Sequence, residues 1–356
     1  MADDAKSAVP GGAARVPAGS AATRARADER LQWRAVHIAA LLFFAAAALF
    51  GIVYGLQGDQ FFLRLATEAL ILGGLALSVD ILLGLVGLLS LGQALYFGLG
   101  AYVAAIMLKH VAQSFWLVMT ACLATGIVAG LIGGLIAIRA RGVYFALITY
   151  GLAQIVAKII YNTRELGASD GIIGIPIIAI PLGVTEIKTD HPAGFFFVVL
   201  ASVGLVYLGL VYMAGTPFGR ALAGVRINER RMPYLGYRPD RLKLAAFVLA
   251  AAIAALAGGL YPMLRGFVSP ELMYFEASTN AIVAAIIGGT GTLIGPLYGA
   301  VILVYLKSVI GTITQHHLMV IGALFMIAVI FFPRGLIGYA RDKLVARSPA
   351  DSGRPA

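Results

Sequence analysis

Long apolar runs alternate with short polar segments along most of the chain. Most of these runs approach the ~20 residues that a helix needs to cross the hydrocarbon core of a bilayer. The pattern therefore predicts an all-α, polytopic bundle of about ten transmembrane helices. The expected spans are 36–56, 69–89, 93–110, 116–138, 143–161, 194–213, 242–262, 276–289, 292–310 and 318–332.

Two segments test this count of crossings. The run 276–289 is short enough to re-enter the bilayer without crossing it. We expect it to cross, because otherwise the basic residues of the C-terminal tail would lie apart from most of the others. The loop 162–193 contains an apolar part, 171–183, that is interrupted by Pro176 and Pro181 and is too short to span. This part could lie in the membrane interface or cover the outer mouth of a pathway.

Composition and charge agree with a membrane protein. Of the 356 residues 60% are hydrophobic and only 12% are charged, and the mean hydropathy is +0.90; globular domains carry about 25% charged residues. The net charge of +10 does not indicate nucleic-acid binding, because the basic residues lie between apolar spans. With ten crossings, 20 basic residues fall on one side and seven on the other. The positive-inside rule then places both termini in the cytoplasm.

The chain divides into three parts. Residues 1–32 are rich in Ala, Gly, Ser and Arg without periodicity, which predicts a disordered cytoplasmic tail. Residues 33–340 form the transmembrane domain, and residues 341–356 form a second cytoplasmic tail. Because the first apolar run follows some thirty polar residues, we expect an uncleaved span and not a signal peptide.

The polar loop 214–243 is the one sizeable charged segment between apolar spans. Thr216 can cap a helix whose first residue is Pro217, where a missing N–H costs nothing. Pro233 should end that helix at about residue 231, and Gly236 permits a turn. The sequence therefore predicts a short helix, a break and a turn outside the bilayer.

An apolar stripe follows this short helix at the spacing of Phe218, Leu222 and Val225. Arg220, Arg230 and Arg231 carry its polar surface. The pattern indicates a docking piece for a soluble partner. The alternative is a basic loop that only fixes the orientation of the chain.

Asp80 falls inside the second apolar run, with Ser90 and Gln93 close by in sequence. A charge within a span costs ~2.5–3.5 kcal/mol on insertion scales and is expected to face the bundle interior or a wet cavity. The three residues could therefore line a substrate path. Alternatively, Asp80 is protonated or paired and bridges two helices.

Glycines recur at four-residue spacing, which allows helices to approach closely in lipid. They are Gly51/Gly55, Gly130/Gly134 and Gly291/Gly295/Gly299. Catalytic signatures such as HExxH and GxSxG do not occur, nor does the phosphate-binding G-x-x-x-x-G-K-[ST]. The five histidines and the single Cys122 predict no metal site, cofactor site or internal disulfide. An intramembrane enzyme would need paired catalytic groups, and only Asp80 is clearly at depth, so we do not expect an enzyme. If ATP drives this protein, another chain must bind it.

A series of motifs resembles the branched-chain amino acid ABC importer permeases of the LivM kind, in order over about residues 36–340. The longest is Leu85-Val-Gly-Leu-Leu-Ser-Leu-Gly-Gln-Ala-Leu-Tyr-Phe-Gly-Leu-Gly-Ala-Tyr102. The others are Arg141-Gly-Val-Tyr-Phe-Ala-Leu147, Ala168-Ser-Asp-Gly171, Pro217-Phe-Gly-Arg-Ala221, Asn228-Glu229, Leu235-Gly236, Lys243-Leu-Ala-Ala-Phe247, Ala257-Gly-Gly259, Gly266-Phe-Val-Ser-Pro-Glu271, Gly288-Gly-Thr-Gly291 and Phe332-Pro-Arg-Gly-Leu336.

The resemblance implies a permease subunit in the bacterial inner membrane that imports branched-chain or other neutral hydrophobic amino acids. It implies a second permease of the LivH kind, two ATPase subunits of the LivG and LivF kind and a periplasmic substrate-binding protein as partners. The loop 214–243 resembles the family's coupling loop, which seats in the ATPase. The residues expected to couple are Phe218, Gly219, Arg220, Leu222, Arg226, Asn228, Glu229, Met232, Leu235, Gly236, Arg241 and Lys243.

The sequence departs from the family pattern at a few positions. Arg230 and Arg231 follow Glu229, where family members often have small residues, so the docking surface could be specific for its own ATPase. Asp80 and Gln93 stand where Asn and His are common, and they resemble the related urea-importer permeases. A urea or short-chain amide importer is therefore the alternative. A secondary transporter is the alternative of a different class, but we find neither clear internal repeats nor a role there for the charged loop.

Overall fold

A computed structural model describes residues 18–182, 185–188 and 191–313, together with positions 319, 322, 323, 326, 335 and 338. The fold is a bundle of helices, and eight helices of this described part are long and apolar enough to cross a membrane. The helices are α1 (Ala18–Gln57), α2 (Gln60–Asp80), α3 (Gln93–Ile106), α4 (Phe115–Ala137), α5 (Val143–Asn162), α6 (Pro192–Gly215), α7 (Pro217–Asn228), α8 (Pro239–Arg265), α9 (Phe275–Gly288) and α10 (Gly295–Ile313). The all-α, polytopic architecture expected from the apolar pattern is confirmed.

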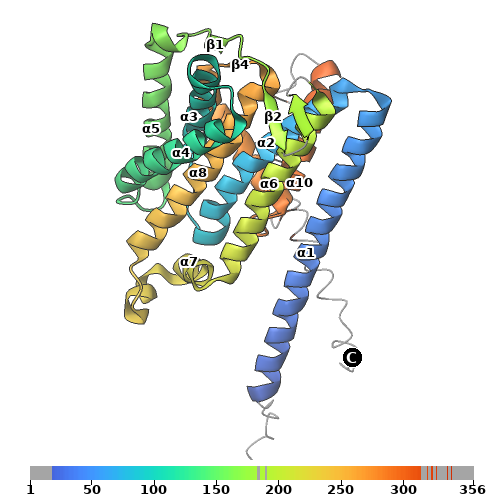
Figure 1. The fold of residues 1–356 in the computed structure, drawn as a ribbon. Helices are drawn as coiled ribbons and strands as arrows, with labels where there is room; N and C mark the ends of the chain where they lie inside the picture. Colours follow the sequence, from blue (N-terminus) through green and yellow to red (C-terminus); the bar gives the residue numbers. More distant parts are fainter. Residues whose placement is uncertain are drawn as a thin grey trace, which may run out of the picture.

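Figure 1 shows α7 lying across one end of the bundle and the short β-strands at the opposite end. We call these the α7 end and the strand end. The strands form two antiparallel pairs: β1 (Ile172–Ile173) with β4 (Phe267–Val268), and β2 (Ala179–Leu182) with β3 (Thr185–Lys188). The apolar part of the loop 162–193 therefore folds into strands that cover the strand end and does not span.

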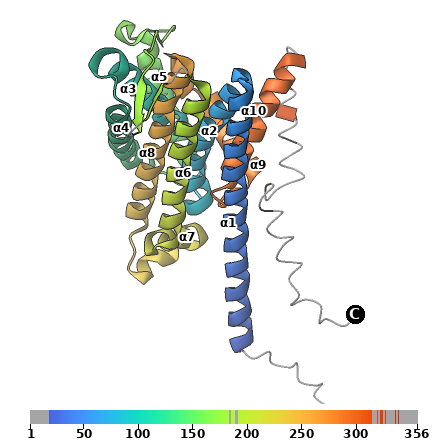
Figure 2. The same ribbon diagram turned by 45° about the vertical axis from the view of Figure 1, so that its right-hand side comes forward.

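The helices α2 and α8 form the centre of the bundle, and α1 stands along its side (Figure 2). In the most apolar window of each span, 83% of α2 and 67% of α8 is buried, against 17% of α1. The apolar side chains that α1 and α4 expose require lipid or another membrane subunit around them.

Small residues bring α4 and α8 together. A Cβ atom on Gly126 would lie 2.7 Å from the Cα atom of Ala252, and one on Gly130 would lie 2.6 Å from the Cβ atom of Ala251. A larger side chain at either glycine would force the helices apart. Gly291 differs from the packing glycines predicted with it, because it lies in a turn with φ +79°.

Helix α2 begins at Gln60, well before the predicted start at residue 69. The charges of Arg64 and Glu68 interrupt the apolar run, but the helix carries them at the strand end, where Glu68 pairs with Arg265 at 2.6 Å. Asp59 caps the helix by accepting a hydrogen bond from the backbone N–H of Phe61. Position 80 therefore lies near the α7 end of this span and not at its middle.

The predicted crossing 276–289 needs a correction. Helix α9 has 14 residues, or about 21 Å of length, and is too short to cross a ~30 Å core alone. The chain enters from the strand end as β4 and a 3₁₀ turn, Pro270–Met273, whose residues Pro270 and Met273 are buried. It reaches the α7 end at the turn 289–294. Non-helical backbone and a half-length helix thus share one crossing.

Helix α1 begins at Ala18, inside the segment 1–32 for which we expected no regular structure. The structure differs from that expectation for residues 18–32, where alanine and arginine favour helix. Residues 1–17, the expected span 318–332 apart from four positions, and the tail 341–356 lie outside the described residues.

Candidate functional site

The polar loop between α6 and α8 folds as a short helix followed by a tight turn. Thr216 caps α7 by accepting a hydrogen bond from Gly219 N–H at 3.4 Å, and Pro217 is its first residue. A 3₁₀ turn, Glu229–Leu235, follows, and Gly236 takes the left-handed conformation with φ +82°. The predicted cap, break and turn are confirmed, although the α-helix ends at Asn228 and not near residue 231.

The apolar stripe of α7 faces the bundle. Leu222 is fully buried, Val225 is 4% exposed, and Phe218 is half-buried and packs against the same core. We expected these residues to contact a partner. For Leu222 and Val225 that expectation is wrong, because α7 packs against the ends of α6, α8 and the segment after α2. Periodicity predicted the stripe correctly but not the surface that it packs against.

A different set of apolar side chains points away from the bundle. Ile227 is 85% exposed, Tyr234 is 90% exposed and Leu235 is 69% exposed. Arg230 and Arg231 are exposed beside them. We call Ile227, Tyr234 and Leu235 the exposed patch of the loop. Three large apolar side chains outside the membrane-spanning segments indicate a surface that another protein covers.

An ion pair links the loop to the start of α8. The Lys243 Nζ atom lies 2.6 Å from the Glu229 carboxylate, and the Lys243 side chain is only 5% exposed. Glu229 therefore anchors the end of the loop within its own chain. We expected Glu229 and Lys243 in the docking surface and did not predict that they would pair with each other.

The other predicted coupling residues lie at different depths in the loop. Gly219 is buried at the α6–α7 corner, where a Cβ atom would lie 2.5 Å from the carbonyl oxygen of Ala214. Met232 is buried against Gly224. Arg220 is exposed and Asn228 is half-buried. Arg241 lies apart from them, in a pocket between α4 and α8.

Asp80 is completely buried and holds the turn between α9 and α10. Its carboxylate accepts hydrogen bonds from the backbone N–H groups of Gly291 at 2.6 Å and Leu293 at 3.1 Å. Both oxygens are thus used inside the protein. These contacts agree with the second hypothesis for Asp80, in which it bridges two parts of the bundle.

The same turn meets the loop through Arg226. The Arg226 guanidinium donates a hydrogen bond to the carbonyl oxygen of Gly84. Gly84 lies in a π-helical segment, Ile81–Val86, that extends α2. A Cβ atom on Gly84 would lie 2.4 Å from the Asp80 carboxylate and 2.5 Å from Gly291 N. We call Asp80, Gly84, Arg226 and the turn 289–294 the junction.

Ser90 and Gln93 are buried after the π-helical segment but take no part in the junction. Ser90 Oγ accepts a hydrogen bond from Gly92 N–H at 3.4 Å. Gln93 has no hydrogen-bond partner at either side-chain amide atom within the described chain. The three cavities described between the helices are lined by other residues. The structure therefore does not bring Asp80, Ser90 and Gln93 together as one lining.

The sequence offered few signals for the junction. Gly291 belonged to a recognisable motif, but nothing in the sequence indicated that Asp80, Gly84 and Arg226 would meet there. The partners of Asp80 are 211 and 213 residues away in the chain.

Comparisons with known proteins agree over most of the chain. The family model described as "Branched-chain amino acid transport system / permease component" matches residues 61–329. The high-affinity branched-chain amino acid transport system permease protein LivM of Escherichia coli (strain K12) is 28% identical over 335 residues, which is 88% of this chain and 79% of that protein.

Of two further relatives, one has a lower sequence identity and the other matches over a shorter part of the chain. The permease protein LivH of the corresponding Salmonella typhimurium system is 24% identical over 298 residues, covering 74% of this chain and 90% of the relative. The autoinducer 2 import system permease protein LsrC of Yersinia pestis (strain Pestoides F) is 34% identical over 113 residues, covering 30% of this chain and 32% of the relative. No solved structure gives a significant match.

The Asp80 hydrogen bonds predict a graded loss of stability. Asp80→Leu leaves two buried N–H groups without an acceptor, and each costs about 1–3 kcal/mol. Asp80→Asn keeps one acceptor oxygen and should destabilise less. The unfolding midpoint of the purified protein measures both, with Glu276→Gln, at an exposed ion pair, as the control. Equal midpoints for Asp80→Leu and the control would contradict this anchoring role.

The Glu229–Lys243 pair predicts rescue by charge exchange. Glu229→Lys leaves two positive charges in contact at the start of α8, and Lys243→Glu leaves two negative ones. Each single variant should lower the unfolding midpoint, and the double variant should recover part of the loss, since the coupling of such a pair is measured by a double-mutant cycle. Strictly additive losses would show that the two charges do not interact.

Proposed function

Because the chain belongs to the branched-chain amino acid transport permease family, we propose that it is the permease subunit of an ATP-driven importer of branched-chain or other neutral hydrophobic amino acids. The observation that carries the proposal is the junction, in which Arg226 of the polar loop contacts a break in α2. A soluble partner that moves α7 would thereby move a membrane-spanning helix. The loop can transmit movement to the spans in this way only if another protein acts on it.

We assign the α7 end to the cytoplasm and the strand end to the periplasm. The excess of basic residues on the α7 side supports this orientation. Two ATPase subunits would then act at the α7 end of the complete importer, one of them on the exposed patch Ile227, Tyr234 and Leu235. A periplasmic binding protein would deliver substrate at the strand end.

A second permease completes the pathway in this proposal. The similarity of one chain to both LivM and LivH relatives supports a pair of related subunits. The poorly buried spans α1 and α4 leave apolar surface for such a partner and for lipid. The substrate would pass between the two permeases, as the amino acids are too polar to cross lipid directly.

The junction suggests how movement passes from the loop to the spans. Leu222 and Val225 hold α7 against the bundle, so the helix moves as one piece with its surroundings. Arg226 then pulls on the carbonyl oxygen of Gly84, in a π-helical segment whose backbone is less regular than an α-helix. Asp80 transmits the displacement to the turn 289–294 and to α9 and α10.

An importer of urea or short-chain amides is the second candidate. Asp80 was one reason for it, but both Asp80 oxygens are bonded to backbone N–H groups, so the Asp at this position has a structural explanation. Among the described residues, Gln93 remains as a buried amide without a hydrogen-bond partner, and it is the polar group that still supports an amide substrate. The LsrC relative carries a different cargo by name, so family membership alone does not decide the substrate.

An uptake assay separates the two substrates. Vesicles containing the complete importer should take up labelled leucine, and excess isoleucine or valine should compete for it. Isoleucine is an isomer of leucine and valine has one methylene fewer, a difference for which an apolar site discriminates by only about 10–200-fold. Urea at the same concentration should not compete. If urea or acetamide competes and the three amino acids do not, the substrate assignment is overturned.

The exposed patch predicts loss of ATPase binding. Tyr234→Ala and Leu235→Ala each remove an anchor whose truncation can cost about 2 kcal/mol or more, roughly thirtyfold in affinity. The measurement is co-purification of the ATPases with the permease, beside uptake at matched expression. Leu205→Ala is the control, since Leu205 is 74% exposed but lies on α6 within a span.

Gly236→Val tests the same surface through the backbone. Gly236 has φ +82° and no atom near its Cβ position, so the substitution strains the turn without a steric clash. It should displace Tyr234 and Leu235 and reduce association as the two truncations do. Undiminished association in all three variants would remove the docking surface from the proposal.

A further inference from the structure

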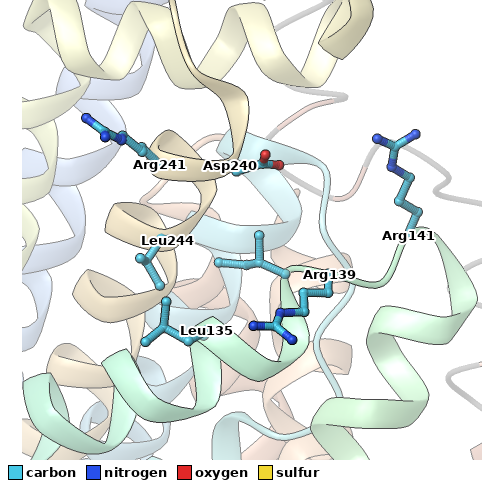
Figure 3. A pocket seen from close by; sticks show the side chains of 8 residues that line it. Leu135, Arg139, Arg141, Asp240, Arg241 and Leu244 are labelled. Atoms are coloured by element: carbon cyan, nitrogen blue, oxygen red, sulfur yellow. The ribbon is translucent and has the colours of Figure 1, made fainter.

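A pocket opens between the end of α4 and the beginning of α8, at the α7 end of the bundle. It has a volume of about 520 Å³ and is lined by Gly134, Leu135, Ile138, Arg139, Arg141, Asp240, Arg241 and Leu244. In Figure 3, the side chain of Arg139 runs toward Leu135, whereas those of Arg141 and Arg241 lie to the two sides of it and extend away from the other labelled side chains. The pocket is separate from the junction and from the exposed patch, which other residues form.

The pocket carries uncompensated positive charge. Its lining contains three arginines and one aspartate, Asp240, which gives a net charge of +2. None of the side chains of Arg139, Arg141 and Arg241 forms a hydrogen bond or salt bridge within the described part of the chain. Exposed arginines change rotamer within nanoseconds, so all three guanidinium groups can turn toward one bound anion.

The wall of the pocket is apolar and continues into the membrane-spanning part of α4. Leu135 and Leu244 lie next to each other in Figure 3. The next turns of α4 expose Leu131, Ile132 and Val128 by 44%, 57% and 59%. A ligand here meets arginines at one end and a strip of hydrocarbon at the other.

We propose that this pocket binds the phosphate headgroup of an anionic phospholipid, whose acyl chains lie along the exposed face of α4. Arginine is well suited to phosphate oxygens, and basic pockets between transmembrane helices bind acidic headgroups. A free phosphate ion would share the charged contacts but would leave the apolar strip unused. Because the strip and the arginines are continuous, the structure favours the lipid.

Because of the position of the pocket, a bound lipid would affect how α4 and α8 are held relative to each other. Asp240 and Arg241 lie in the first turn of α8, directly after the polar loop. Gly126 and Gly130 hold the rest of α4 against α8, so the pocket is where the two helices begin to separate. A headgroup held by Arg139 of one helix and Arg241 of the other fixes this separation, and with it the position of the loop.

Native mass spectrometry of the delipidated complete complex tests the proposal. Phosphatidylglycerol and phosphatidylcholine with identical acyl chains are titrated separately, and phosphatidylglycerol should bind more tightly. Removing a basic residue near an anionic headgroup costs about fivefold, so the triple variant R139Q/R141Q/R241Q should lose roughly a hundredfold in affinity for this lipid. The triple variant K109Q/K158Q/R164Q removes the same charge at the strand end and should bind as the wild type does.

Asp240→Asn gives an effect of the opposite sign. It removes the one negative charge of the pocket and should raise the affinity for phosphatidylglycerol by about fivefold, a gain that misfolding cannot produce. A large excess of inorganic phosphate should not displace the lipid, because the acyl chains hold it as well.

Three results would overturn the assignment. The first is equal affinity for the two lipids, or an unchanged affinity in the pocket triple variant. The second is displacement of phosphatidylglycerol by inorganic phosphate, which would make the ligand a soluble anion. The third is loss of the ATPases from the pocket triple variant while lipid binding stays the same, which would make the pocket a protein-docking surface.

Discussion

Two backbone N–H groups in the turn between α9 and α10 depend on one carboxylate, that of Asp80. Water cannot satisfy backbone groups inside an apolar bundle, so an irregular turn is tolerated there only if the protein supplies its partners. Asp80 supplies two of them and Thr292 a third, through its hydrogen bond from Gly295 N–H. The short helix α9 can therefore end inside the packed protein, next to the break in α2, with these three N–H groups paired.

This arrangement concentrates the irregular backbone of the bundle at the level of the polar loop. The π-helical segment after Asp80 and the turn 289–294 touch each other, and Gly84 has no room for a side chain between them. Arg226 reaches this spot from α7. Regular helices resist bending, whereas breaks and turns can change dihedral angles locally. The loop thus contacts the spans at a place where their backbone is irregular.

The sequence predicted the spans and the loop because local patterns determine both. Apolar length located the helices, and Thr216, Pro217 and Gly236 marked the cap and the turn. What faces what depends on tertiary packing, which periodicity does not contain: the stripe of Leu222 and Val225 was assigned to a partner and is buried in the chain itself. Asp80 was recognised as a residue that must face the interior, but its partners come from a turn more than 200 residues later. For the same reason the sequence did not predict that α9 shares its crossing with non-helical backbone. That non-helical part is stable only within the folded bundle.

The first two turns of α8 show how these contacts are divided. Arg241 faces the pocket beside α4, whereas Lys243, two residues later, is buried against Glu229 of the loop. Successive helical residues point about 100° apart, so residues two positions apart lie on nearly opposite faces. One helix start is therefore held to the loop on one side and borders a basic, membrane-level pocket on the other. Arg241 and Lys243 belong to the start of one helix, so a movement of the loop that shifts Lys243 would also shift Arg241 and with it the lining of the pocket.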